Sequence, residues 1–254
     1  MTAQSAIVLV HGAFQSAATW DLVAPRLKQR GRPVLVATLT GLGPNAGPLS
    51  EHVTLDTHIR DVVELLQRHD LQDVVLVGHS YGGMVVTGVA EHARDRLGHL
   101  VYVDALVPEH GQAGIEIMTA PMADTFRRMA AEGGGWRMAA SDTLVDKWGL
   151  EEGSPARRFV EARLCDFTIR CFEQPLEAPT RAAASLPRTY IASVKEDYPA
   201  RIVFEPFAAR ARREGWGYNE LPTGHDCQAE APDALSELLL SVPADSPRNV
   251  HSPM

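Results

Sequence analysis

The sequence predicts an α/β protein whose central sheet is mostly parallel and is covered by helices on both faces. Two observations support this prediction. Short, almost continuous apolar runs recur along the chain, and segments with helical spacing of apolar residues separate them. Strands that are buried on both faces have this unbroken apolar character because neither face contacts water. The chain has 254 residues, which is enough for one full hydrophobic core.

Six apolar runs that end at turn residues are predicted to be strands. The first, "AIVLVHG", is rich in β-branched residues and is stopped by glycine, which is typical of a short buried strand. In chain order, the predicted strands cover residues 6–12, 32–39, 73–78, 99–106, 188–194 and 216–221.

In the first half of the chain, the segments between predicted strands have apolar residues at helical spacing. After the first strand, Trp20, Val23 and Leu27 fall on one helical face, and Gly31 closes the segment. Thr54 can cap the next helix, whose apolar stripe consists of Ile59, Val62, Val63 and Leu66. The helices predicted here cover residues 19–31, 55–70 and 84–93.

The alternation of strand and helix stops between residues 107 and 186. This stretch contains Trp136, Trp148 and scattered aromatic residues, but no convincing central strand. We therefore expect a helical cap insertion over 107–186, a core formed by 1–106 and 187–242, and a flexible Pro- and Ser-rich tail over 243–254.

Composition and charge exclude several classes of partner. Lys and Arg number 24 against 32 Asp and Glu, and the resulting net charge of −8 disfavours binding to nucleic acid or an anionic membrane. No apolar run approaches the roughly 20 residues of a membrane span. The chain enters its first strand without a signal-like segment, and its three cysteines lack C-x-x-C spacing. We expect a cytoplasmic protein with reduced thiols, and the sequence leaves a homodimer open.

The segment "GHSYG" at residues 78–82 matches the pattern G-x-S-x-G. It lies between a predicted strand and a predicted helix, which is the context of a nucleophile elbow. Glycines two residues before and two after Ser80 remove side chains where strand and helix converge. We therefore predict that Ser80 is a catalytic nucleophile.

A serine nucleophile needs a base, and His225 is the best candidate among 10 histidines. It lies in "LPTGHDC", directly after the last predicted strand, which fits the chain order Ser, acid, His. His11 and His79 lie at strand ends, where packing and hydrogen bonding are the expected roles. The histidines expected to be solvated, on helices or at their ends, are His52, His58, His69, His92 and His99.

An oxyanion hole requires two backbone N–H groups that point to one position. The residue after the nucleophile, Tyr81, is expected to supply one of them. Ala13, in the loop after the first strand, is expected to supply the other, and Gly12 lets that backbone approach closely.

These features together resemble the α/β-hydrolase superfamily. The segments that carry the resemblance are "IVLVHGAF", "TLTGLG", "TLDTHIRDVVELL", "DVVLVGHSYGGMVVTGVA", "LVYVDALVPEHGQ" and "TGHDCQAEAPDAL". More narrowly, the chain is similar to small serine esterases related to plant methyl-ester esterases and hydroxynitrile lyases, from Ile7 to about Leu240. The resemblance implies an α/β-hydrolase fold and a serine hydrolase that uses neither a metal nor an organic cofactor. It also implies a helical cap that shapes an apolar pocket.

Two positions favour an esterase over a lyase. The lyases that this chain resembles carry Thr or Asn where it has Gly12, and a group of them has a lysine where it has Asp226. An anion at that position would oppose the departure of cyanide. We expect a carboxylesterase that cleaves a small apolar or aromatic ester or carbamate through an acyl-enzyme. The alternatives are a hydroxynitrile lyase-type C–C lyase and a non-catalytic ligand-binding relative.

The acid of the catalytic triad has three candidates. Asp104 ends the fourth predicted strand, a position where the plant relatives have alanine, although some α/β-hydrolases place their acid there. The plant relatives carry their acid after the fifth strand, which corresponds here to Asp197 or Glu196. We favour Asp104, then Asp197, then Glu196, and expect the acid to be buried against His225 Nδ1.

The remaining expectations concern the pocket. Phe14, Leu106 and the cap residue Trp136 are the candidates for substrate contact, together with Tyr81.

No cluster of His, Cys or Asp has the spacing of metal ligands, and "GLGPNAG" lacks the nucleotide-binding fingerprint.

Overall fold

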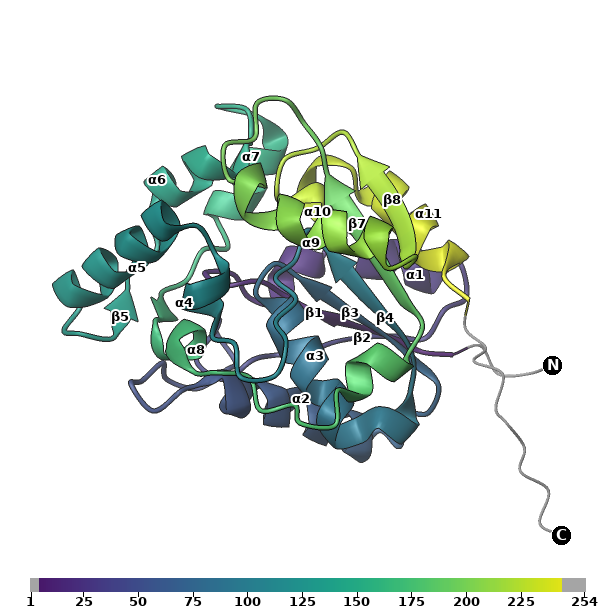
Figure 1. The fold of residues 1–254 in the computed structure, drawn as a ribbon. Helices are drawn as coiled ribbons and strands as arrows, with labels where there is room; N and C mark the ends of the chain where they lie inside the picture. Colours follow the sequence, from purple (N-terminus) through teal and green to yellow (C-terminus); the bar gives the residue numbers. More distant parts are fainter. Residues whose placement is uncertain (1–4, 244–254) are drawn as a thin grey trace, which may run out of the picture.

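The computed structural model describes residues 5–243, and a six-stranded sheet forms their centre (Figure 1). Every strand pair in this sheet is parallel, and the strand order is β2-β1-β3-β4-β7-β8. All six predicted strands and the predicted fold class are confirmed. The strands are β1 (Ile7–Val10), β2 (Val34–Val36), β3 (Val74–His79), β4 (Leu97–Val103), β7 (Arg188–Ser193) and β8 (Gly217–Leu221).

Side chains alternate between the two faces of the sheet, and each face has its own core. In β3, for example, Val75 and Val77 pack on one face, whereas Val74 and Leu76 pack on the other. Figure 1 shows helices on both sides, as a buried parallel sheet requires. One face is covered by α1 (Ala24–Gln29), α10 (Cys227–Glu230) and α11 (Pro232–Ser241), and the other by α2 (Leu55–Arg68), α3 (Gly82–Ala93) and α9 (Arg201–Arg213).

Local sequence signals explain where α2 begins. The helices after β7 were not predicted. Thr54 is the N-cap of α2, and its backbone N–H donates to Thr57 Oγ1 at 3.2 Å. The helix predicted over 19–31 divides into a 3₁₀ turn, η1 (Ala17–Trp20), and the shorter α1. No helix was predicted after residue 194, yet α9, α10 and α11 lie there, and α9 contains Pro206.

Residues 107–186 connect β4 to β7 and lie mainly beyond one end of the sheet, to the left in Figure 1. The division into core and cap stays a prediction. The segment is mostly helical, and a two-stranded antiparallel pair joins its middle to its later part. Its elements are α4 (Gly114–Ile117), α5 (Ala120–Glu132), β5 (Arg137–Met138), α6 (Asp142–Val145), η3 (Asp146–Trp148), α7 (Pro155–Glu161), β6 (Phe167–Thr168), α8 (Arg170–Glu173) and η4 (Ala182–Ser185). Of the predicted tail over 243–254, all but Pro243 lies outside the described residues.

Candidate active site

Ser80 lies in the sharp turn between β3 and α3. Its φ angle is +55°, in the left-handed region that residues other than glycine seldom adopt. Two hydrogen bonds hold this turn: the Ser80 N–H donates to Val103 O, and the Leu106 N–H donates to Ser80 O, both at 3.1 Å. The turn therefore fixes Ser80 to the end of the neighbouring strand β4.

Glycines on either side of Ser80 allow the close approach of the elements. A Cβ atom on Gly78 would lie 2.5 Å from Gly82 O, and one on Gly82 would lie 2.9 Å from Val10 O. Because real Cβ atoms do not come this close to backbone oxygens, both positions need glycine. The G-x-S-x-G pattern thus has a steric cause in this fold.

His225, in the loop after β8, is held from several sides. Its backbone N–H donates to Trp148 O at 2.8 Å, and its carbonyl oxygen lies 3.0 Å from His79 Nε2. The imidazole stacks on the Phe204 ring with centroids 4.7 Å apart. These contacts bury the side chain to 4% exposure and restrict its orientation.

Asp104 is the carboxylate that meets His225. Its Oδ2 atom lies 2.7 Å from His225 Nδ1, and its Oδ1 accepts a hydrogen bond from the Ser193 N–H at 3.3 Å. A φ angle of +42° at Asp104 turns the chain at the end of β4 so that the side chain lies under the imidazole. The acid assignment stays a prediction, and this geometry supports Asp104.

The two other candidate acids lie elsewhere. Glu196 and Asp197 are exposed, and within residues 5–243 neither forms a hydrogen bond with His225. The next residue, Tyr198, is buried, and its hydroxyl donates to Asp104 Oδ2 at 2.6 Å. Sequence reasoning did not identify Tyr198, because a tyrosine in a loop gives no motif signal.

Ser80 and His225 line one cavity of about 930 Å³. Ala13, Phe14 and Leu106 line it as well, as the sequence analysis expected for the first loop and for the segment after β4. Among the hydrogen bonds of the described residues, none joins Ser80 Oγ to His225, and in unliganded enzymes this contact is often loose.

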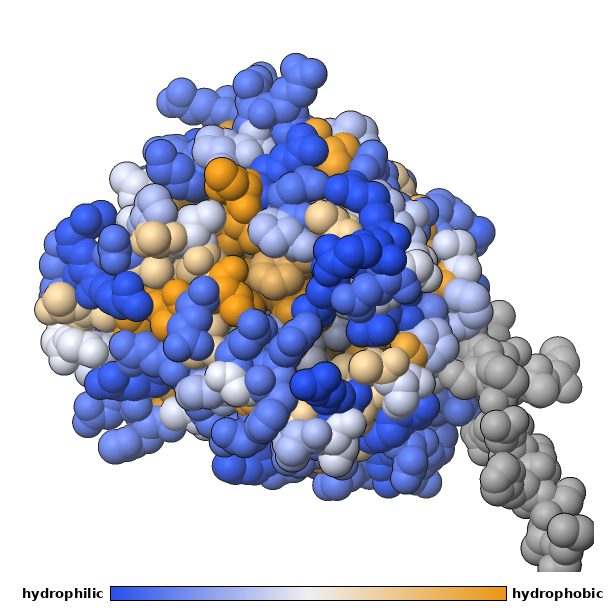
Figure 2. Space-filling model, in the orientation of Figure 1, coloured by the Kyte–Doolittle hydropathy of each residue, from blue (hydrophilic) through white to orange (hydrophobic). Residues whose placement is uncertain are grey.

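The cavity also extends under residues 107–186, the predicted cap, and is mainly apolar. Figure 2 shows apolar side chains gathered around a hollow on the face that carries α4, α5 and the start of α9. Trp136 is half-buried and is not part of the cavity wall, whereas Trp148 is. The cap and α9 contribute, among others, Met118, Met122, Phe126, Met129, Leu144, Trp148, Phe172, Ile202, Val203 and Phe204.

The backbone beside Ser80 suits an oxyanion hole. Within residues 5–243, neither the Ala13 nor the Tyr81 N–H donates to a backbone carbonyl. A Cβ atom on Gly12 would lie 2.9 Å from Ser80 Cβ and 3.4 Å from Ser80 Oγ, so the first loop passes directly beside the serine. The roles of Ala13 and Tyr81 stay predictions.

Two histidines close to Ser80 and His225 are buried, as expected. Burial, and then the nearby His225, hold the pKa of His79 well below its usual value. Burial lowers the pKa of His11 to about 4. Both rings are therefore neutral near pH 7, and the His79 ring is tilted by 40° against the His225 ring with centroids 4.6 Å apart.

The expectation that His58 and His99 are solvated is wrong, because both are buried. His58 lies on the inward face of α2, where its Nδ1 is 3.0 Å from Tyr81 Oη and its Nε2 is 2.9 Å from Thr40 O. Burial lowers its pKa to about 4. A neutral histidine can satisfy both polar neighbours at an otherwise apolar helix position, which the helical pattern alone did not reveal.

Asp226 is fully buried next to His225 in the sequence. Its Oδ1 accepts hydrogen bonds from the Gln15 and Gln228 side-chain amides, and its Oδ2 has no hydrogen-bond partner in the described structure. Burial raises its pKa to about 6. Both hydrogen-bond donors to this carboxylate are neutral amides, and Asp226 is absent from the cavity wall.

Residues 5–243 contain no group of three or more His, Cys, Asp or Glu side chains placed to hold a metal ion. None of the helices formed by these residues combines the length and the apolar character that crossing a bilayer demands.

Comparison with known proteins gives consistent results. A family model described as the alpha/beta hydrolase family matches residues 7–238. A carbendazim hydrolyzing esterase from Nocardioides sp. (strain SG-4G) is 36% identical over 92% of this chain and 98% of its own. Methylesterase 9 of Arabidopsis thaliana is 33% identical over 40% of each chain. The solved structure of an extracellular alpha/beta-hydrolase from a Paenibacillus species superposes with a TM-score of 0.83 at 21% identity, covering 95% of this chain and 100% of that one.

Proposed function

This chain is an esterase-type member of the alpha/beta hydrolase family, and we propose that it hydrolyses small apolar or aromatic esters or carbamates through an acyl-enzyme on Ser80. The observation that carries the proposal is the joint placement of Ser80 and His225 on one apolar cavity, with Asp104 Oδ2 2.7 Å behind the imidazole. Nucleophile, base and orienting acid are the three parts that acyl transfer requires.

In the proposed first step, His225 Nε2 accepts the Ser80 proton while Ser80 Oγ attacks the carbonyl carbon. Asp104 keeps the other proton on Nδ1 and stabilises the imidazolium that forms. The N–H groups of Ala13 and Tyr81 donate to the oxyanion of the tetrahedral intermediate.

The intermediate then collapses when His225 returns its proton to the leaving alkoxide. Water enters next, and His225 removes a proton from it as the water oxygen attacks the acyl carbon. Collapse of the second tetrahedral intermediate releases the acid and restores the Ser80 hydroxyl. At the end of the cycle Ser80 and His225 are again neutral, and a carbamate substrate yields a carbamic acid instead of a carboxylic acid.

The wall of the cavity supports an uncharged substrate. It includes Phe14, Leu106, Phe126 and Phe172, whose aromatic and aliphatic groups favour apolar ligands. Phe126 and Phe172 stack with centroids 5.2 Å apart, so this part of the wall is preformed. A cavity of about 930 Å³ is large enough for an aromatic ester.

A fluorophosphonate probe tests the proposal without knowledge of the substrate. We expect one adduct, which peptide mapping assigns to Ser80, and its loss in Ser80→Ala and His225→Ala. A screen of 4-nitrophenyl esters and aryl carbamates, with carbendazim among them, should then show turnover that falls at least about 10⁴-fold in Ser80→Ala. A folded protein that forms no adduct would contradict the serine hydrolase mechanism. Cleavage of mandelonitrile in place of the esters would favour the lyase.

The cytoplasm remains the proposed compartment. Cys165, Cys171 and Cys227 are free thiols, and Cys171 and Cys227 are buried. Reduced cysteines of this kind are typical of cytoplasmic proteins. Mass spectrometry of protein isolated from cells under denaturing conditions, with an alkylating reagent present, should find all three cysteines alkylated and therefore reduced in the cell.

A further inference from the structure

Three polar atoms meet behind the catalytic imidazole, and only two of them belong to a triad. Tyr198 Oη lies 2.6 Å from Asp104 Oδ2 and 2.9 Å from His225 Nδ1, while those two atoms are 2.7 Å apart. We propose that Tyr198 is a positioning residue whose hydroxyl donates to Asp104 and thereby sets both the orientation and the basicity of His225. This inference rests on the proposed roles of Ser80, His225 and Asp104.

The protons available in this cluster decide which group donates. His225 Nδ1–H and the Tyr198 O–H are donors, and the Asp104 carboxylate can only accept. Burial, and then the charge of Asp104, raise the pKa of Tyr198 well above its usual value, so the phenol stays protonated. Asp104 Oδ2 therefore receives two hydrogen bonds, one from the imidazole and one from the phenol.

Tyr198 is fixed firmly enough to position its neighbours. It is 3% exposed, and its ring stacks on His225 at an interplanar angle of 27°. The Arg201 N–H donates to Tyr198 O at 3.1 Å, which ties the residue to the start of α9. A Cβ atom on Gly149 would lie 3.0 Å from Tyr198 Cα, so the segment after η3 packs directly against its backbone.

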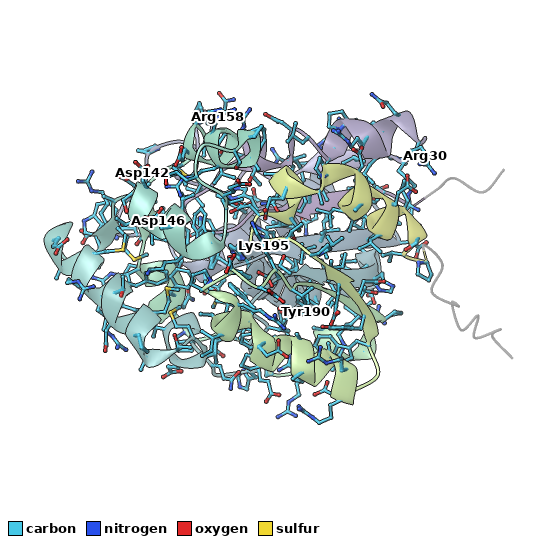
Figure 3. All side chains as sticks on the ribbon, turned by 90° about the horizontal axis from the view of Figure 1, so that it is seen from above. Arg30, Asp142, Asp146, Arg158, Tyr190 and Lys195 are labelled. Atoms are coloured by element: carbon cyan, nitrogen blue, oxygen red, sulfur yellow. The ribbon has the colours of Figure 1, made fainter. Side chains whose placement is uncertain are left out.

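Further contacts hold the loop after β7, which contains Tyr198, to the predicted cap and to α10. Lys195, near the centre of Figure 3, donates from Nζ to Gly149 O at 2.7 Å and pairs with Glu230 at 3.2 Å. The Ala200 N–H donates to Lys147 O at 3.0 Å. Residues on both sides of Tyr198 are therefore anchored, and its hydroxyl has little freedom to leave Asp104.

The phenol has a predictable effect on the chemistry. A hydrogen bond from Tyr198 withdraws negative charge from Asp104, so the carboxylate stabilises the imidazolium less than a bare carboxylate would. Without the phenol, the Asp104 carboxylate would hold the imidazolium more strongly, and the acidic limb of the kcat/KM profile should move to higher pH.

The test compares Tyr198→Phe with Tyr102→Phe, using 4-nitrophenyl butyrate and the fluorophosphonate probe. Tyr102 is also a buried tyrosine, but its hydroxyl bonds Thr87 instead of the triad. For Tyr198→Phe we expect kcat to fall about 10–100-fold with KM nearly unchanged and phosphonylation of Ser80 to slow, because Asp104 and His225 lose the hydroxyl that orients them. The acidic limb should lie at higher pH. Tyr102→Phe should keep the wild-type pH profile.

Replacement of Tyr198 by 3-fluorotyrosine keeps the ring and strengthens the O–H donor. The acidic limb should then move to lower pH, opposite to the shift in Tyr198→Phe. An unchanged limb in both proteins, or shifts in the same direction, would overturn the positioning role and leave Tyr198 as packing. If Tyr198→Phe does not fold, the fluorotyrosine protein still decides the matter. A wild-type protein that the probe does not label would instead contradict the proposed function.

Discussion

Asp104 Oδ2 and His225 Nδ1 lie 2.7 Å apart although 121 positions separate the two residues in the chain. Asp104 follows β4, which is the direct neighbour of β3, and β3 leads to Ser80. The serine and the carboxylate therefore come from the ends of adjacent strands, and the histidine loop reaches over from β8 at the edge of the sheet. This arrangement leads to four predictions.

Asp104→Asn should lower kcat by about 10³–10⁴-fold while the protein stays folded. An amide can donate to Nδ1, which stabilises the imidazole tautomer that carries its proton on Nε2 and cannot accept one from Ser80. Steady-state kinetics with a 4-nitrophenyl ester measures the loss. Asp197→Asn and Glu196→Gln are the matched controls, because both side chains are exposed, and they should retain wild-type kcat. A large loss in either control would move the acid to the loop after β7.

Gly12→Ala should reduce phosphonylation and ester turnover by about 10²–10³-fold. The new methyl group would lie 2.9 Å from Ser80 Cβ, so either the serine or the oxyanion-hole backbone has to move. Gly31→Ala is the control, since no atom lies within 4 Å of its Cβ position and its φ is +82°. It should cost stability without loss of activity. Equal activity in the two variants would refute a tight contact between Gly12 and Ser80.

Asp226 should make the protein less stable as the pH rises from about 4 to about 6. Its pKa rises from 3.8 to about 6 on folding, so the native state binds more protons in this window and stability falls with pH. The effect is on the order of 3 kcal/mol and is complete above the folded pKa. Denaturant unfolding at several pH values should show that Asp226→Asn gains stability relative to wild type across the window. Asp233→Asn, at an exposed carboxylate, should follow the wild-type curve, and a parallel curve for Asp226→Asn would contradict the prediction.

Met122→Trp should narrow the substrate range. Met122 lines the cavity from α5, and a larger side chain there removes space for bulky acyl groups. We expect kcat/KM for 4-nitrophenyl benzoate to fall about 10-fold or more, with 4-nitrophenyl acetate nearly unchanged. Arg127→Trp is the control, because Arg127 is exposed on the same helix and lies outside the cavity wall. If both esters lose activity equally, Met122 does not limit the size of the substrate.

Features that depend on local sequence could be predicted from the chain alone. The six strands could be predicted from apolar runs. The sharp turn at Ser80 could be predicted from Gly78 and Gly82, because the close approach of strand and helix leaves no room for a side chain at either position. Three carboxylates near strand ends remained candidates for the acid, because a strand-end position does not specify which side chain turns inward. Tyr198 could not be predicted either, because its hydrogen-bond partners are 94 and 27 positions away in the sequence and only the folded loop brings them together.

The hydrogen bond from the His225 N–H to Trp148 O has a consequence for protein engineering. His225, the proposed general base, is held in part by a segment that lines the cavity, so in the proposed mechanism specificity and reactivity share one backbone contact. A chimera that imports residues 107–186 from a relative must reproduce that carbonyl at the same place. Chimeras that reproduce only the cavity side chains of the relative should bind substrate but turn it over slowly. Chimeras whose exchange boundaries leave the segment around Trp148 intact should be the most active.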